Sequence, residues 1–504
     1  MSKKATLLIV LVIVIGAFVG IKWMETTGPE ESGVEAVAGP VHLRLQSFAL
    51  SLNPLKMADV ESRRVATLLY VGLIIQNQDG STQPAAAESW KHSGKEWEFT
   101  LKPGLIFSNG QALRVQDVVM SICNAMQPTS PWAWALASIE HSTSADGKKV
   151  ECTGVGIVDE NTIRIVEAQP VPWFLDAIGG PAGWILPAGD TKESAYGVMP
   201  GLGPYTIEEF IPDTRVVMKP RSSGSAIAPG TTGIQFDYIA DDAVAAGAFT
   251  AGKLQVLDLT SPKLVEYLVD AGTGKLNTAG VLVQRKWDRV RIAIINEKSL
   301  LARGFDETQV RYFIQSYSAA VDRKKIAQDT LGIATPLETS FPPVPRVAPS
   351  LTKSTDGLPE ASLTVITESD AYSDLIATSL PKTVGPVTID YRGVDKGVLI
   401  QSLIKGDFDI ASILIEATTH SPEFWKSFFT PGNPFTAFGK PIAGLENVEV
   451  NDEAGVQRAA ELIEQNGNWI GILQERRLQA IAPGITGVSY TPSGQTNYAA
   501  IKRQ

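Results

Sequence analysis

The sequence predicts a mixed α/β protein of several domains, and three observations lead to this prediction. The chain has 504 residues, which is too long for one compact core. Its composition is that of a globular protein, with 44% hydrophobic and 19% charged residues. From Val41 onward, short alternating patterns typical of strands are interleaved with longer patterns typical of helices. No repeat of solenoid length interrupts this order.

The first half of the chain begins with strands, helices and tight turns in close succession. Apolar residues two apart mark the strands, and apolar residues three or four apart mark the helices. An Asn-Gly pair at 109–110 and the polar run 159–161 indicate hairpin turns. The predicted elements are a strand at 41–45, a helix over 63–73, a strand at 97–101, a helix from about residue 115 and a hairpin over 155–165.

A segment rich in proline and glycine at 187–204 predicts turns, and strand and helix patterns alternate again after it. The patterns predict helices over 241–251, 310–330 and 452–465, and a strand at 363–366. Asp241 and Asp242 are interpreted as the start of a helix, because acidic residues favour a helix N-terminus. We therefore set aside the interpretation of this pair as hydrolytic carboxylates.

The N-terminus carries the pattern of an export signal or a short membrane anchor. Lys3 and Lys4 precede an apolar run from Ala5 to Val19. The nearest small-x-small cleavage pattern, at 36–38, lies far downstream, which favours an uncleaved anchor with an outside body over a cleaved signal. No cysteine follows the run, which excludes a lipid-anchored lipoprotein. Residues 23–40 are expected to form a flexible tether.

Charge and cysteine content restrict the function further. The formal net charge of −10 argues against a nucleic-acid partner, which needs a clustered basic surface. The two cysteines, Cys123 and Cys152, could pair in an oxidising compartment. Alternatively Cys123 is a core residue, because it shares an apolar helix face with Val119 and Met126.

Motifs for nucleotide, metal or hydrolytic chemistry are weak in this sequence. Gly154 and Gly156 lead into a polar turn and lack the third glycine of a dinucleotide fingerprint, so they are interpreted as a strand. The sequence contains no phosphate-binding P-loop and no Gly-x-Ser-x-Gly nucleophile turn. The four histidines are scattered without metal-ligand spacing. We therefore expect no enzyme activity, no resident cofactor and no structural metal.

Several short motifs occur in the order and spacing of one known family. They are Leu52-Asn53-Pro54 with Leu69-Tyr70, the run from Glu88 to Ser121 with Trp97, Phe99, Gly104, Phe107 and Gly110, Gly201-Leu202-Gly203-Pro204-Tyr205, Asn296, Phe305-Asp306, Val310-Arg311, Val321-Asp322-Arg323, Phe408-Asp409 and the end from Ile481 to Val488. In this series the sequence resembles the bacterial extracellular solute-binding proteins of family 5, which include dipeptide-, oligopeptide- and nickel-binding proteins. The resemblance covers about residues 41–488.

The resemblance implies an α/β, two-lobed periplasmic-binding-protein-like fold (type II, cluster C) with an extra hairpin-rich domain in the first lobe. The implied crossings between lobes lie near 285–288 and 480–484. The expected division is an anchor or signal at 1–22, a tether at 23–40, a discontinuous domain I at 41–80, 198–286 and 482–504, domain II at 81–197 and the second lobe at 287–481.

The resemblance also implies a function. The expected protein is an extracytoplasmic, monomeric receptor that holds a peptide-like or other organic solute between its lobes and delivers it to an ABC importer. The alternative is a membrane-anchored sensor or assembly partner that retains the fold without transport. A hydrolase is the remaining and least favoured hypothesis.

One family position departs from its pattern at the expected ligand site. Where peptide-binding relatives often carry an Asp that pairs with the peptide amino terminus, this sequence has Thr418, and Glu416 is the nearest carboxylate. If Glu416 takes over that role, the ligand is a cation or an amine. If it does not, a neutral or anionic ligand is favoured, and Glu416 simply faces solvent.

The remaining candidate ligand contacts are transferred by position. Met57 and Ala58 lie in the loop that contacts ligand in relatives, and Trp184 lies before a Leu-Pro pair. Tyr391 and Arg392 precede a helix of the second lobe. An aromatic side chain could stack on a ligand there, and Arg392 could bind a carboxylate.

Overall fold

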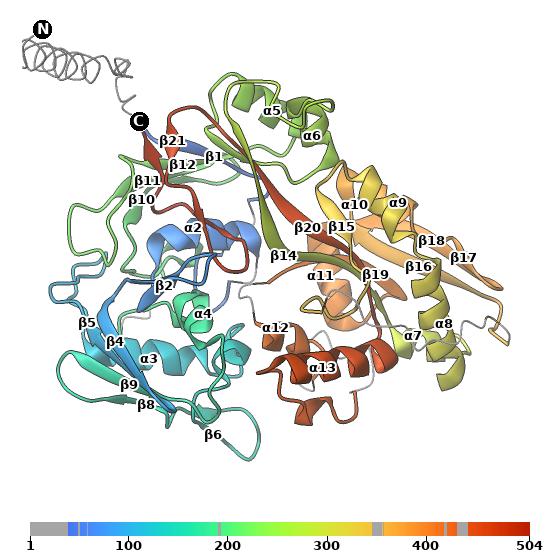
Figure 1. The fold of residues 1–504 in the computed structure, drawn as a ribbon, viewed down its shortest axis with the longest axis horizontal. Helices are drawn as coiled ribbons and strands as arrows, with labels where there is room; N and C mark the ends of the chain where they lie inside the picture. The colour runs from blue at the N-terminus through green and yellow to red at the C-terminus, as the bar shows by residue number, and fades with distance from the viewer. Residues whose placement is uncertain are drawn as a thin grey trace, which may run out of the picture. The chain divides into compact units, whose positions relative to one another are not determined.

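The computed structural model describes residues 39–48, 51–57, 59–189, 193–344, 355, 357–417, 421–430 and 442–504 (Figure 1). The chain divides into two compact units, Met1–Ala38 with Arg503–Gln504, and Gly39–Lys502. The fold below is that of the second unit. No helix among the described residues combines the length and the apolar character needed to cross a bilayer. The expected anchor and tether lie almost entirely outside the described residues.

One large mixed sheet organises the second unit. Its strands in the described chain are β1 (Val41–Leu45), β10 (Tyr205–Ile211), β11 (Arg215–Pro220), β12 (Ile234–Tyr238), β13 (Val256–Asp258), β14 (Val281–Ile295), β15 (Ala334–Pro336), β16 (Ala361–Glu368), β17 (Thr383–Val384), β18 (Val387–Val394), β19 (Ile410–Glu416) and β20 (Trp469–Ile481). The strand order is β10-β11-β12-β1-β13-β20-β14-β19-β16-β18-β17, and β15 pairs with β20. β1 is parallel to β12 and β13, and β16 is parallel to β18 and β19.

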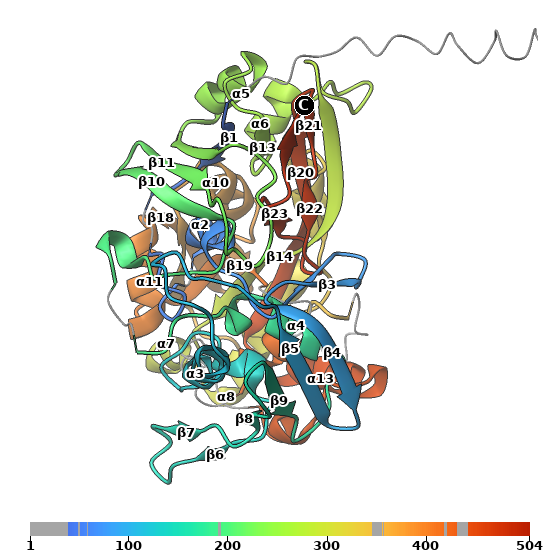
Figure 2. The same cartoon turned by 90° about the vertical axis from the view of Figure 1, so that its left-hand side faces the viewer.

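Two long antiparallel strands, β14 and β20, join the two halves of this sheet (Figure 2). β20 pairs with β13 at its C-terminal end, while β14 pairs with β19 over 289–295. The pairing of β14 with β20 shifts register between Lys286 and Val290, and a bulge of this kind bends a strand. We call the elements between these strands, from residue 296 to 468, lobe 2, and the remainder lobe 1. The expected domain boundaries remain a prediction.

Lobe 1 begins with helices that pack beside the first half of the sheet. These helices are α2 (Val60–Leu69), α5 (Asp242–Thr250) and α6 (Pro262–Leu268). Asp241 accepts a hydrogen bond from the backbone of Val244, which confirms it as a helix cap. The helix predicted over 63–73 exists but ends earlier, since the backbone is already extended at Tyr70. Gly72, two residues further on, approaches another segment closely. A Cβ at Gly72 would lie 2.8 Å from the carbonyl oxygens of Ile178 and Gly183.

The hairpin-rich part of lobe 1 has its own small sheet. Its elements are β2 (Ile74–Gln76), β3 (Thr82–Pro84), β4 (Ala87–Ser93), β5 (Glu96–Leu101), α3 (Val115–Ala125), β6 (Ser142–Thr143), β7 (Val150–Glu151), β8 (Val155–Ile157), β9 (Thr162–Val166) and α4 (Phe174–Gly179), with short 3-10 turns η1 (Ala133–Leu136) and η2 (Pro181–Gly183). The four-stranded sheet has the order β4-β5-β9-β8. Phe99 and Leu101 are buried on one face of β5, which confirms the predicted alternation. The tight turn at 109–110 also forms, since Gly110 donates to the carbonyl of Phe107.

In lobe 2, helices cover both faces of the other half of the sheet. Its helices are α7 (Glu297–Ala302), α8 (Glu307–Ala320), α9 (Arg323–Asp329), α10 (Ala371–Thr378), α11 (Lys396–Lys405), α12 (Pro422–Ser427) and α13 (Glu453–Asn466). Alternate residues of β14 enter different cores, because Ala293 and Ile295 belong to one apolar cluster and Ile292 and Ile294 to another. The helix predicted over 310–330 is two helices, since Asp322 caps α9.

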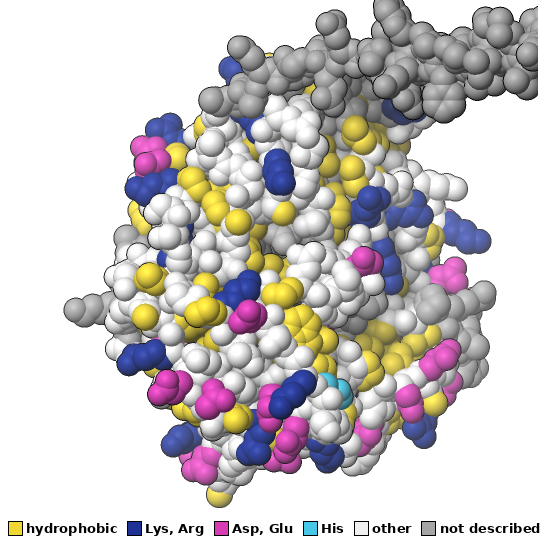
Figure 3. Space-filling model, turned by 60° about the vertical axis from the view of Figure 1, so that its left-hand side comes forward, with side chains coloured by type: hydrophobic (Ala, Val, Ile, Leu, Met, Phe, Trp, Pro, Cys, Tyr) yellow, Lys and Arg dark blue, Asp and Glu magenta, His cyan; other side chains and the backbone are white. Residues whose placement is uncertain are grey.

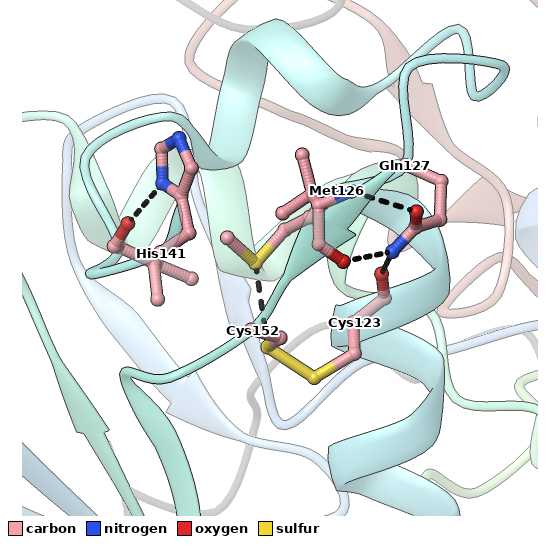
Figure 4. Close-up of a disulfide and its surroundings, with 7 residues drawn as sticks. Cys123, Met126, Gln127, His141 and Cys152 are labelled. Carbon is pink, nitrogen blue, oxygen red and sulfur yellow. Dashed lines mark hydrogen bonds between the residues drawn. A yellow bond between two sulfur atoms is a disulfide. The ribbon is translucent and has the colours of Figure 1, made fainter. Parts of the chain in front are cut away.

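Cys123 and Cys152 form a disulfide, which decides between the two sequence alternatives (Figure 4). Their Cα atoms lie 5.4 Å apart, and the bond ties α3 to the strand segment before β8. Gln127 reinforces the same connection, because its Nε2 donates to the carbonyls of Cys123 and Val150 at 3.0 Å and 2.9 Å. The Met126 sulfur lies 3.6 Å from that of Cys152.

We expect the double substitution Cys123→Ser and Cys152→Ser to lower the free energy of unfolding by about 2–4 kcal/mol, because the bond closes a loop between residues 29 positions apart. Denaturant titration with and without a reductant measures this effect. The reductant should destabilise the natural protein and leave the variant unchanged. Equal stability of both proteins under oxidising conditions would contradict the prediction.

Candidate functional site

The junction between the lobes gathers several buried polar side chains. In open α/β sheets, ligands bind outside the carboxyl ends of the strands. β16 and β19 end at this junction, and α10 begins directly after β16. α2 follows the loop after β1 in lobe 1. The group that we call the interlobe cluster consists of Arg63, Trp287, Arg289, Arg291, Tyr372, Glu416 and Glu475.

An ion pair between Arg63 and Glu416 joins the two lobes. The Arg63 Nη2 lies 3.3 Å from the Glu416 Oε1, and the side chains are only 7% and 4% exposed. One of the two sequence interpretations was that Glu416 faces solvent. The structure contradicts it, because the side chain is buried. Its Oε2 and the Nε of Arg63 are enclosed without a hydrogen-bond partner among the described residues.

Trp287 lies between two arginines of the crossing strands. The Arg289 and Arg477 guanidinium carbons lie 4.6 Å and 3.9 Å from its ring centroid, within cation–π range. The Arg289 Nε lies 3.1 Å from Glu475 Oε2. Burial lowers the pKa of Arg289, but the charges of Glu475 and Glu416 outweigh burial and leave this pKa raised. Arg289 therefore stays charged at the junction.

A second network around Asp258 holds the crossing strands to α2. Asp258 accepts from Arg477 Nη1 at 3.0 Å and from Gln479 Nε2 at 2.9 Å, and Arg64 Nη2 lies 3.6 Å away. Burial raises the pKa of Asp258, but the charges of Arg477 and Arg64 outweigh burial and leave it lowered. The network fixes β13, β20 and α2 beside the interlobe cluster.

Arg291 lies further along β14, with two tyrosines of lobe 2 close by. Its guanidinium carbon lies 5.4 Å from the Tyr372 ring centroid. Burial raises the pKa of Tyr372, and the charge of Glu475 raises it further. Tyr391, on β18, also interacts electrostatically with Arg291, and its hydroxyl donates to Asp374. The pKa of Tyr391 is raised too, and burial is again the largest cause. Both phenols therefore stay neutral near neutral pH.

The sequence-predicted site residues separate in the structure. Glu416 belongs to the interlobe cluster, and Tyr391 lies beside it. Met57 is fully buried in the apolar core of lobe 1, and Trp184 stacks on Tyr70 in the same core with ring centroids 5.5 Å apart.

Three further candidates complete this comparison. Arg392 is exposed, next to Tyr391 on β18. Ala58 and Thr418 lie outside the described residues. Ligand contact by any of the seven candidates remains a prediction.

Sequence reasoning missed most of the interlobe cluster, although two signals were present. Arg289 and Arg291 stand two apart in β14, directly before its apolar end Ile292–Ile295. Glu475 and Arg477 stand two apart within the buried strand β20. Residues two apart on a strand share a face, so charges in this pattern on a buried strand indicate a polar site.

Two other features connect lobe 1 with lobe 2. Trp134 of η1 packs edge-on against Phe424 of α12, with ring centroids 4.9 Å apart. A shallow hollow of about 520 Å³ is lined by residues that include Trp97 and Phe174 of lobe 1 and Asp452 of lobe 2. Asp452 already caps α13, and His92 in this hollow stacks on Trp97, so the hollow offers little polar chemistry. On the face drawn in Figure 3, basic and acidic side chains are interspersed.

A bilobal α/β fold with a buried polar cluster between its lobes fits the class of the solute-binding proteins, because ligand sites occur preferentially between domains. The chain belongs to the bacterial extracellular solute-binding proteins of family 5. The family model described as "Bacterial extracellular solute-binding proteins, family 5 Middle" matches residues 81–370, which is more than half of the chain. The two-lobed fold expected from the sequence is confirmed.

Similar proteins include the probable deoxycholate-binding periplasmic protein YgiS of Escherichia coli K12, 26% identical over 58% of this chain and 55% of that protein. The chain thus matches about half the length of this curated relative, and less of others. The solved structure of the Escherichia coli murein tripeptide binding protein MppA superposes with a TM-score of 0.75 at 19% identity, covering 93% of this chain and 99% of that one. An unliganded open form of MppA gives a TM-score of 0.60 at 19% identity, covering 93% and 98%.

Proposed function

We propose that this protein captures a small organic solute between its lobes outside the cytoplasm and delivers it to an ABC importer. The observation that carries the proposal is the set of enclosed polar atoms at the lobe junction. The atoms without a hydrogen-bond partner among the described residues include Arg63 Nε, Trp287 Nε1, Arg291 Nε, Ser412 Oγ and Glu416 Oε2. An enclosed polar atom without a partner costs about 1–3 kcal/mol, so these atoms favour an arrangement of the lobes in which a bound solute pairs with them.

Lobe closure supplies the mechanism in this proposal. A ligand can favour a closed state only by its greater affinity for that state. Arg63 on lobe 1 and Glu416 on lobe 2 meet only when the lobes approach, and the bulged strand β14 lies where a hinge is needed. The lower TM-score with the open form of MppA supports a closed arrangement of this chain. The importer would then recognise the closed protein.

The names of the relatives support the location and the ligand class that we propose. YgiS is described as probably deoxycholate-binding and MppA as murein peptide-binding, and both are described as periplasmic. We therefore propose short peptides and amphipathic organic acids as first candidates. In this proposal the protein acts as a monomer, held at the outer side of the cytoplasmic membrane by residues 1–22 or released after cleavage.

A thermal-shift screen of the full-length protein in mild detergent tests the proposal. The panel holds short peptides, amines, oligosaccharides, bile acids and metal chelates. A ligand at one hundred times its dissociation constant is expected to add about 2.7 kcal/mol of stability. The variant that tests the junction is Glu416→Gln. Its matched control is Glu96→Gln, which changes an exposed acid of β5.

A stabilising solute whose effect weakens in Glu416→Gln and persists in Glu96→Gln supports a receptor. Loss of uptake of that labelled solute in cells without the protein then supports delivery to an importer. If the folded protein responds to no member of the panel, the proposal fails, and the anchored sensor or assembly role is favoured.

A further inference from the structure

Most of the buried charged side chains at the lobe junction form ion pairs. Glu416 pairs with Arg63, and Glu475 pairs with Arg289. In the neighbouring network the acids and bases also balance, since Asp258 and Glu61 face Arg64 and Arg477. Arg291, a buried arginine of β14, takes part in none of these pairs.

Arg291 makes no ion pair within the described part of the chain. The residue is only 3% exposed, and it interacts with the side chains of Tyr372 and Tyr391. Asp288, a buried acid of the same strand, has an interaction of its own. Asp374, the carboxylate nearest to Tyr391, already accepts the Tyr391 hydroxyl. Because both phenols stay neutral near neutral pH, neither can neutralise Arg291.

The hydrogen-bonding capacity of Arg291 is also uncommitted. It donates no hydrogen bond to any described residue, and its Nε is enclosed. The terminal nitrogens are not among the enclosed unpaired atoms. Ser412 lies on the neighbouring strand, on the same face of the sheet, and its Oγ is enclosed without a partner as well. Together they provide a cation and a hydroxyl for one anionic group.

We propose that Arg291 is a specificity-determining residue that binds the carboxylate of an acidic solute held between the lobes. The inference rests on the proposed function and names its substrate class. A buried cation without a counter-charge is costly, and a carboxylate removes that cost. The planar guanidinium presents two parallel donors, which match the two oxygens of a carboxylate. Tyr372, stacked near the guanidinium, would keep its plane oriented toward the ligand.

Isothermal titration of the full-length protein with matched acids and amides tests this inference. The probes are trialanine, octanoate and phenylacetate, each compared with the compound in which an amide replaces the carboxylate. We expect at least one acid to bind about 10–100-fold more tightly than its amide, the range for a hydrogen-bonded charge. In Arg291→Met the preference should fall below about threefold, whereas Arg291→Lys should retain part of it.

The matched control is Arg164→Met, which removes a half-exposed arginine from β9 and should leave the preference unchanged. If Arg291→Met does not fold, the acid-to-amide ratio of the natural protein and of Arg291→Lys still decides. Equal binding of acid and amide, or a preference that survives in Arg291→Met, would overturn the inference. If an amide or an amine binds and no acid does, the inference fails while the proposed function stands. If no probe and no member of the wider panel binds, both fail.

Discussion

Replacing Asp258 by Asn is expected to lower the free energy of unfolding by about 3–5 kcal/mol, because it leaves buried arginines without their counter-charge. Asp258 accepts from Arg477 at 3.0 Å and from Gln479 at 2.9 Å, and its side chain is only 10% exposed. Asn keeps the shape but not the charge, so the desolvation cost of Arg477 is no longer offset. Denaturant titration at neutral pH measures the loss. Asp213→Asn, an exposed residue of the turn before β11, is the matched control.

The pH dependence of this loss identifies its cause. The folded-state pKa of Asp258 is lowered, so its charge stabilises the fold fully above the unfolded-state pKa of about 3.9. That contribution disappears as the pH falls through the folded-state pKa. The stability difference between the natural protein and Asp258→Asn should therefore shrink in acid, below about pH 4. A difference that stays constant from neutral pH into acid would contradict the charge explanation.

The sequence was sufficient to predict most of the fold because its elements obey local rules. The alternation of Val41, Leu43 and Leu45 places three buried side chains in β1. Asp452 begins α13 as a cap, as the pattern over 452–465 predicted. Local rules fail where distant backbones meet. Just beyond α2, Gly72 lies against the backbone of Ile178, more than one hundred positions away, and no local pattern predicts this contact.

The candidate site was harder to predict, because its residues come together only through the topology. Arg63 and Glu416 are 353 positions apart, and no local pattern relates them. Trp184 was a reasonable candidate by residue type, but its ring packs against Tyr70 in the lobe 1 core. Large aromatic side chains are most often packing residues, and only the contacts show which one is available to a ligand. Glu416 was found because a departure from the family pattern drew attention to one short segment.

The second large effect is expected at the ion pair between the lobes. Arg63→Met or Glu416→Gln leaves one buried partner without its counterpart, at a cost of about 3–5 kcal/mol if the lobes stay closed. Opening the lobes returns that partner to water, so the protein should open rather than unfold. Small-angle scattering without added ligand should therefore show a larger radius of gyration for each single variant. The double variant Arg63→Met with Glu416→Met should return toward the natural value, since apolar pairs of similar volume replace buried ion pairs well.

The same variants decide what Glu416 does for a ligand. If Glu416 binds an amine, as one sequence interpretation holds, Arg63 competes with that amine for the carboxylate. Arg63→Met should then bind amine probes more tightly than the natural protein, and Glu416→Gln should not bind them. If Glu416 serves only to join the lobes, both variants should weaken binding of every ligand equally, by the fraction of protein that they open. The exposed pair Glu209 and Arg215, within one hairpin, provides the control, because its loss should change neither the scattering nor the binding.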